Sequence, residues 1–397
     1  MGERHRAEPI SNIDNNLKTL RAAKGMSQGE LAESAKITRQ AVCAIEGNHY
    51  LPTTAVALRL AGVLGCRVED LFSLRATGEI IHGEFIDETE QADTTMISTR
   101  VKVARVGNRY VVRPVRALGE LLAYTVPADG LLVGGEGDTR PRSRPSNRVR
   151  VQLLRDRRVI EQEISIAGCD PAVFLAGEYL RRYKETATVT GWMMGSGAAV
   201  EALKRREVHM AGLHIKDEKT GESNLPYLRS HLKGDDYLIV TFAAWEEGLI
   251  VGRGNPKTIR SIEDLGRPDV TLINREKGAG ARQLLDQRLD QEGLLKEDVR
   301  GYNLMADSHF QVARRIAEGQ ADVGIGVRSA ANLFALSFIP LQQSRYDLVV
   351  PKSYLSVIPS IGNLFDAIVS RQFRTEIEAL GGYDTTETGK IRQLRRQ

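Results

Sequence analysis

The stretch Ser27–Gly47, SQGELAESAKITRQAVCAIEG, decides the fold of the first part of the chain. Its apolar residues recur at helical spacing on both sides of a short break at Ala35–Ile37. Ser27 and Thr38 are good helix N-caps, so we expect two short helices, the second over Arg39–Glu46 and ended by Gly47 and Asn48. The apolar positions are Leu31, Ala32, Ile37, Val42 and Ile45. This pattern packs the two helices at a steep angle and leaves the start of the second one exposed.

The exposed start reads Thr38-Arg39-Gln40. Arginine binds guanine bidentately and glutamine binds adenine in the same way, so both side chains suit base edges. Gln28 opens the preceding helix, where its side chain and nearby amides are placed to meet a phosphate. We therefore predict contacts with double-stranded DNA.

The same stretch resembles the Cro/C1-type (XRE) helix-turn-helix family. The resemblance is carried by Ser27-Gln28-x-x-Leu31-Ala32, by the run Thr38–Gly47, and by Pro52 and Leu71-Phe72. It implies DNA contacts from Gln28, Thr38, Arg39 and Gln40, with Asn48 near the DNA backbone. The alternative is a helical bundle that mediates only protein contacts. Glu46 is expected to anchor the fold rather than to touch acidic DNA.

The bulk properties indicate a multidomain globular protein. A chain of 397 residues implies two or three domains, and 42% hydrophobic with 27% charged residues is ordinary for such proteins. We expect an all-α helix-turn-helix head over residues 11–74, a β-rich connecting segment over 76–162, and an α/β two-lobed domain over 163–380. Asp138–Arg150 is expected to be an exposed loop, and Gly389–Gln397 a frayed end. The net charge of +4 permits DNA binding without arguing for it.

The three cysteines, Cys43, Cys66 and Cys169, are too few and too scattered for a disulfide framework or a Cys-rich zinc site, which fits a reducing compartment. Met1–Pro9 lacks the apolar segment of a secretion signal. No apolar run approaches the ~20 residues that span a bilayer. The sequence thus predicts a cytoplasmic protein with no membrane contact.

The α/β region places polar residues where ligands bind in open sheets. Cys169 and Asp170 follow the apolar strand Ile164–Ala167, at the carboxyl edge of the predicted sheet. Ser196 lies at a helix N-terminus, where free amides favour an anion. Cys169 has an alternative interpretation as a buried structural thiol.

The run Asn274–Arg282, NREKGAGAR, turns from a strand into a long helix. Gly278 and Gly280 let the backbone approach a ligand closely, and Arg275 and Arg282 add positive charge together with Lys277. We expect this run, including Asn274, to bind an oxyanion; the alternative is a sharp turn with solvated cations. Ser308-His309, at a helix start, is a further candidate, although a lone histidine there often caps the helix or lies on the surface.

A chain that builds one α/β lobe, then a second, and returns to the first forms a hinged clamshell. The sequence resembles the binding-protein-like (PBP superfamily) domain of molybdate- or molybdopterin-related regulators. The residues that carry this are Ala167–Ala172, Gly195-Ser196, Ala211–His214, Gly248–Val251, Gly254–Lys257, Asn274-Arg275, Gly278, Arg282 and Ala321–Gly324. The resemblance implies a type II periplasmic-binding-protein fold and a ligand such as molybdate, tungstate or a molybdenum-cofactor species. The chain departs from its relatives at Ala279 and Ala281, where they often carry hydroxyls.

Together these features predict a ligand-responsive DNA-binding transcriptional regulator. We expect a homodimer, because such heads read two half-sites about one DNA turn apart. No metal-ligand cluster, Walker-type loop or matched pair of carboxylates is visible, so neither a catalytic nor a metal site is expected. The alternative is an enzyme or a ligand carrier with a DNA- or protein-binding appendage.

Overall fold

The computed structural model describes residues 13–74, 79–86, 99–118, 120–133, 147–182, 187–217 and 220–395. The chain divides into two compact units, Met1–Ile80 and Ile81–Gln397, which we describe separately. Most of the predicted loop at 138–150 and the last two residues of the predicted frayed end lie outside the described residues. Within the described residues, no helix combines the length and the apolar character needed to cross a membrane.

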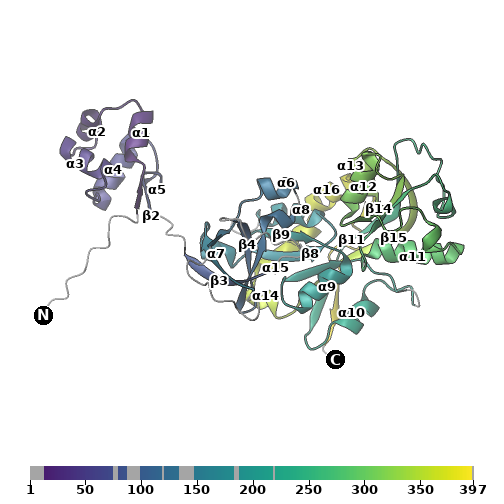
Figure 1. Ribbon diagram of the computed structural model, residues 1–397. Coiled ribbons are helices and arrows are strands. Elements are labelled where there is room, and N and C mark those ends of the chain that lie inside the picture. Colours follow the sequence, from purple (N-terminus) through teal and green to yellow (C-terminus); the bar gives the residue numbers. More distant parts are fainter. Residues whose placement is uncertain are drawn as a thin grey trace, which may run out of the picture. The chain divides into compact units, whose positions relative to one another are not determined.

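The first unit is a bundle of short helices closed by a two-stranded sheet (Figure 1). The expected caps are present: Ser27 accepts from the Glu30 amide, and Thr38 accepts from the Ala41 amide. The left-handed residue that ends the second predicted helix is Asn48, not Gly47. The elements are β1 (Ile13–Asn15), α1 (Leu17–Ala23), α2 (Gln28–Ser34), α3 (Arg39–Glu46), α4 (Thr54–Leu64), α5 (Val68–Leu71) and β2 (Phe72–Leu74).

The second unit begins with a small closed barrel in the order β3-β5-β4-β6-β7. Its interior is built from β-branched residues that alternate along the strands, among them Val101, Val103 and Val112, all fully buried. The elements of this region are β3 (Ile80–Phe85), β4 (Arg100–Val106), β5 (Arg109–Pro114), η2 (Val115–Leu118), α6 (Glu120–Thr125), β6 (Gly130–Val133), β7 (Arg148–Leu153) and α7 (Arg157–Ile160).

The barrel shares its core with the α/β region, which is why the two form one compact unit rather than the two separate domains expected at 76–162 and 163–380. Ala104 and Val111 of the barrel belong to the same apolar cluster as Ile164 of the α/β sheet. A buried ion network adds to this joint: the Lys102 ammonium lies 2.8 Å from both Asp129 and Glu163. Buried charges need such partners, so the network fixes the barrel against the sheet.

The α/β region contains one sheet that passes through both lobes, in the order β13-β12-β14-β11-β15-β10-β8-β9. At each end three strands run parallel, and the two long strands in the middle are antiparallel. The strands are β8 (Ile164–Gly168), β9 (Val189–Met193), β10 (Met210–Leu213), β11 (Tyr237–Val251), β12 (Leu272–Arg275), β13 (Met305–Ala306), β14 (Val323–Val327), β15 (Ser337–Pro351), β16 (Tyr383–Asp384) and β17 (Ile391–Leu394).

Strands β11 and β15 connect the lobes. The first part of β11 and the last part of β15 join β10 of the first lobe, whereas their other ends join β14 of the second lobe. The pairing of β11 with β15 shifts register between Thr241 and Ala243 and again between Glu247 and Gly248. These irregularities bracket the passage between the lobes, where a hinge is expected. The two-lobed α/β architecture predicted from the sequence is thus confirmed.

Helices cover both lobes (Figure 1). The second lobe is enclosed by α11, α12 and α13, and its core is formed by residues such as Leu272, Leu285 and Val323. The helices of the α/β region are α8 (Ala172–Leu180), α9 (Ser196–Lys204), α10 (Leu225–His231), η3 (Glu263–Gly266), α11 (Gly280–Glu292), η4 (Lys296–Asp298), α12 (His309–Ala317), α13 (Arg328–Leu333), α14 (Tyr354–Val357), α15 (Ser360–Val369) and α16 (Arg371–Ala379).

The C-terminal residues form a strand, so the expectation of a frayed end is wrong. Strand β17 pairs with β11 from Tyr237↔Leu394 to Val240↔Ile391, and β16 pairs with the same strand further along. Leu394 is buried. The α/β fold therefore continues beyond residue 380, because an unpaired edge of the long strand β11 is available there.

A buried histidine also joins the barrel to the first lobe. His209 is fully buried; its Nδ1 accepts from the Ser165 amide at 3.0 Å, and its Nε2 lies 2.9 Å from the Arg105 carbonyl oxygen. Burial lowers the pKa of His209 to about 4, although the hydrogen bond to Arg105 opposes the shift. The ring is therefore neutral in the folded protein, with Nε2 carrying the proton.

This pKa predicts an acid-sensitive joint. Between about pH 6.5 and 4 the unfolded chain binds a proton at this residue that the folded chain does not, so stability falls as the pH falls, by roughly 3 kcal/mol over the whole interval. We expect His209→Gln to flatten the dependence of unfolding free energy on pH. Urea unfolding followed by fluorescence measures it, since both tryptophans, Trp192 and Trp245, lie in the second unit. The exposed His82→Gln serves as control; equal slopes for all three proteins would contradict the assignment.

Candidate functional site

The first unit presents the start of α3 to solvent. Thr38, Arg39 and Gln40 are all exposed, and the Thr38 side chain caps the helix. Val42 and Ile45, on the opposite side of α3, are fully buried. Burial of the apolar side thus holds the helix while the two base-reading side chain types project outward.

A buried carboxylate supports this arrangement. Glu46 accepts from Arg21 Nε at 2.6 Å and from Gln28 Nε2 at 2.8 Å. Burial by itself would raise the pKa of Glu46, but the hydrogen bonds from Arg21 and Gln28 lower it overall. Glu46 therefore connects α1, α2 and α3, as expected for a residue that anchors the fold. The side chain of Gln28, predicted to reach a phosphate, is held at the start of α2 by this carboxylate.

Asn48 lies next to the two-stranded sheet. Its Oδ1 accepts from Asn15 Nδ2 at 2.9 Å, and the same Asn15 amide donates to the Ile45 carbonyl. Asn48 is exposed and adopts a left-handed conformation that asparagine tolerates. Its contact with the DNA backbone stays a prediction.

We predict that Glu46→Ala destabilises the first unit by about 2–3 kcal/mol, because it removes charge-assisted hydrogen bonds and leaves the Arg21 guanidinium without its carboxylate partner. Hydrogen–deuterium exchange of peptides from α1–α3 in the full chain measures the effect on this unit alone. The exposed Glu33→Ala, in α2, is the matched control. If hydrogen exchange is unchanged in Glu46→Ala, the Glu46 carboxylate does not stabilise the first unit.

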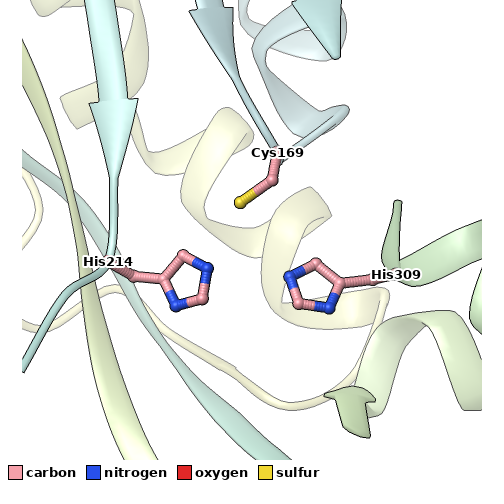
Figure 2. Close-up of side chains that lie close together, drawn as sticks. All are labelled: Cys169, His214 and His309. Atoms are coloured by element: carbon pink, nitrogen blue, oxygen red, sulfur yellow. The ribbon is translucent and has the colours of Figure 1, made fainter. Parts of the chain in front are cut away.

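In the second unit, three side chains from both lobes meet in the cleft. Cys169 follows β8, His214 follows β10, and His309 opens α12 of the second lobe. Their ligand-type atoms all lie within 4.8 Å of one another, and all three residues are buried. Figure 2 shows the thiol and the two rings pointing toward a common centre. No metal-ligand cluster is visible in the sequence, because residues 169, 214 and 309 are far apart along the chain and the fold brings them together.

His214 is oriented by a carboxylate. Its Nδ1 lies 3.2 Å from Glu247 Oε1, an ion pair between two fully buried groups. Burial alone would lower the pKa of His214, but Glu247 and the Cys169 thiol raise it to about 10. The same pair lowers the pKa of Glu247 against the effect of its burial. In turn Glu247 accepts hydrogen bonds from Ser344 and Gln342 of β15, so the imidazole is tied to the strands that connect the lobes.

His309 is held only by packing. Neither ring nitrogen has a hydrogen-bond partner, although the residue is 1% exposed. Its ring centroid lies 5.6 Å from that of His214 and 5.7 Å from that of Trp245. Burial, with the charges of Arg275 and His214, lowers the pKa of His309 well below its usual value. A neutral imidazole with both nitrogens unpartnered is costly unless a ligand satisfies it.

Asp170 lies beside the cluster at the start of α8. Its Oδ1 accepts from the Ala172 amide and from the Tyr383 hydroxyl, both at 2.9 Å, while Oδ2 is buried without a partner. Burial raises the pKa of Asp170 to about 6. Ser196, also predicted to bind the ligand, is fully buried and accepts from the His214 amide. Both residues thus border the cluster.

The lobes are in close contact along glycines. A Cβ on Gly195 would meet Glu276 at 2.6 Å and Ala279 at 3.2 Å, and a Cβ on Gly280 would collide with the backbone and ring of His214. The Gly197 amide donates to the Gly278 carbonyl at 3.3 Å. The small residues of the predicted ligand loop therefore allow the backbones of the two lobes to come close together.

The remaining predicted ligand residues make contacts within the second lobe. Arg275 is 1% exposed and donates to Glu276, Ala306 and Asp307, but its Nη1 has no partner. Arg282 donates to the Arg275 carbonyl and stacks over Tyr302. Asn274 bonds the Tyr302 carbonyl, and Ser308 caps α12. Of these residues, Arg275 offers a free donor, whereas the other three support the loop and the helix.

Four further residues line the site, although the sequence patterns did not mark them as site residues: His214, Trp245, Glu247 and Tyr346. A signal existed for His214, which follows an apolar strand just as Cys169 does. The other three lie in the middle of β11 and β15, where the chain reads AAWEEG (243–248) and QQSRYD (342–347). This mixture of apolar and polar residues does not show which side chains face the cleft. Trp192, by contrast, donates to Ser165 and belongs to the core.

Comparison with known proteins places both units in families. The model of the family described as Helix-turn-helix matches residues 17–71, and the family described as PBP superfamily domain matches residues 177–368. The chain is 32% identical over 228 residues to YvgK of Bacillus subtilis (strain 168), covering 57% of this chain and 73% of that one. It is 42% identical over 62 residues to the HTH-type transcriptional regulator YgzD of the same organism, covering 16% of this chain and 94% of that one.

The chain belongs to the PBP superfamily domain family and carries an XRE-type helix-turn-helix at its N-terminus. It is therefore a DNA-binding regulator with a binding-protein-like ligand domain. Among solved structures, a phosphate ABC transporter substrate-binding protein from Clostridium perfringens with bound phosphate is similar, with a TM-score of 0.43 and 14% identity, covering 58% of this chain and all of that one.

Proposed function

We propose that this chain is a ligand-responsive transcriptional regulator in which binding of a small ligand in the cleft alters operator binding by the head. The observation that carries the proposal is the closure of two lobes on buried polar groups with unpartnered atoms, in a chain whose other unit exposes Arg39 and Gln40. Buried unpartnered donors and acceptors are rare in proteins and indicate a ligand. The head acts as a homodimer in the cytoplasm, where DNA is available, and the ligand domain binds without turnover.

We further propose that the ligand is a small anion such as molybdate, tungstate or a molybdenum-cofactor species. The N-termini of α9, α11 and α12 meet at the cleft through Ser196, Gly280 and His309, and Arg275 Nη1 is unpartnered. Helix N-termini favour negative charge. The cavity between His214, Glu247 and Gly280 measures only about 20 Å³, so an oxyanion requires the lobes to open first.

The test has two stages. Selection from random DNA with the full chain identifies an operator, and titration with molybdate, tungstate, sulfate and phosphate then measures operator affinity. We expect one anion to change this affinity by about 5- to 150-fold, the usual size of allosteric coupling. A thermal shift with the same anion reports binding independently. Failure to select any sequence would sink the proposal, and chemical conversion of a bound ligand would favour an enzyme.

Arg39→Ala is expected to weaken binding to the selected operator by roughly 5- to 150-fold and to affect random DNA little, because it removes a base contact worth about 1–3 kcal/mol. Fluorescence anisotropy with both DNAs at one salt concentration measures the ratio. Lys18→Ala, on α1, removes the same charge from an exposed position and controls for electrostatics. An equal loss on both DNAs would show that Arg39 contacts phosphate only.

A further inference from the structure

We propose that Cys169, His214 and His309 form a binding site for a divalent transition-metal ion of the zinc class that bridges the two lobes. This site goes beyond the proposed function, because it does not depend on DNA binding or on an oxyanion. One thiol and two imidazoles are the ligands that such borderline ions prefer, and three protein ligands leave one position open.

The geometry fits an ion of this size. In a tetrahedral zinc site, with bonds of about 2.0–2.3 Å, the ligand atoms lie roughly 3.3–3.8 Å apart. The three ligand-type atoms here already lie within 4.8 Å of one another. This limit exceeds the spacing in a zinc site by roughly 1 Å, so a side-chain adjustment of that size brings the three atoms onto one ion.

The hydrogen-bond pattern also indicates a ligand at this point. His309 is buried with both nitrogens unpartnered, which costs free energy that an apolar residue would avoid. Its ring faces the Cys169 thiol and the ring of His214 (Figure 2). Coordination of an ion by one ring nitrogen removes the part of this cost that comes from that nitrogen.

His214 has the second partner that metal-binding histidines usually have. Its Nδ1 is paired with Glu247 at 3.2 Å, which leaves Nε2 for the ion. Ser344 and Gln342 in turn donate to Glu247 and fix its orientation. A carboxylate that orients a ligating imidazole in this way raises the basicity of the ligand and typically affects metal affinity 10–100-fold.

The charges near the cluster favour a cation despite the helix N-termini. Glu247 and Asp170 are both buried here, and Asp170 Oδ2 has no partner. The nearby Arg275 keeps one unpartnered nitrogen, Nη1, but its charge is offset by Glu276, whose carboxylate lies 2.8 Å from Arg275 Nε. When the ion binds, Cys169 coordinates it as the thiolate, and this charge together with the two bordering carboxyl groups offsets the charge of the ion.

The consequence is a closed clamshell. Cys169 and His214 belong to the first lobe and His309 to the second, so the ion forms bonds across the cleft. Binding is then linked to closure, because the open form offers only two of the three ligands.

Cobalt binding to the reduced, chelator-treated full chain tests the site. We expect one Co²⁺ per chain, with visible ligand-field bands and a thiolate-to-cobalt charge-transfer band, and displacement by Zn²⁺. Cys43→Ser/Cys66→Ser removes the other two thiols and is expected to behave as the wild type. Cys169→Ser is expected to lose the charge-transfer band, and His309→Asn to lower affinity at least tenfold.

Two measurements guard against misfolded variants. In Cys43→Ser/Cys66→Ser, Zn²⁺ should protect Cys169 from alkylation, and it should slow hydrogen exchange at residues 195–199 and 276–282. Both measurements use a protein in which Cys169, His214 and His309 are unchanged. The metal site is overturned if this protein neither binds Co²⁺ nor shows protection by Zn²⁺ from alkylation and hydrogen exchange. It is also overturned if Cys169→Ser keeps an unchanged charge-transfer band. Operator binding is measured in parallel to separate the two proposals. If the chain binds metal but selects no operator, the proposed regulator function is contradicted and the metal site is not.

Discussion

The pairing of β11 with β15 is the constraint on which the rest of the second unit depends. Two strands of fifteen residues each pass through both lobes, so every other strand of the sheet takes its place relative to them. The register shifts on either side of Ala243–Glu247 interrupt the ladder where the chain crosses between lobes. Since bulged strands bend more easily than regular ones, the same pairing that fixes the lobes also allows them to move.

The hinge and the candidate site share residues. Trp245 and Glu247 come from the middle of β11, and Tyr346 comes from the facing part of β15. The Tyr346 side chain occupies the space in which a Cβ on Gly168 or Gly212 would lie, so a larger residue at either position would displace the Tyr346 ring. A ligand that binds His214 therefore touches, through Glu247, the strands that bend. This short path gives a physical route from occupancy of the cleft to the relative position of the lobes.

The barrel adds a second attachment to the first lobe. Lys102, Asp129 and Glu163 form a buried network, and His209 bonds the Arg105 carbonyl. Partners of this kind are costly to separate, so the barrel and the first lobe behave as one body. Movement of the clamshell is consequently movement of the second lobe against this larger body.

The sequence by itself determined the elements and their order. Caps at Ser27 and Thr38, helical spacing at Leu31 to Ile45, and apolar strands followed by polar residues are local patterns, and local patterns specify helices, strands and the two-lobed class. It also identified Cys169, Asp170, Ser196 and His309 as residues at strand or helix ends. The tertiary structure decided which of them meet. Cys169, His214 and His309 are separated by long stretches of chain, and only lobe closure brings a thiol and two imidazoles within reach of one ion. It also turned Arg282 and Asn274 toward their own lobe, because a buried polar side chain takes whichever partner the packing offers.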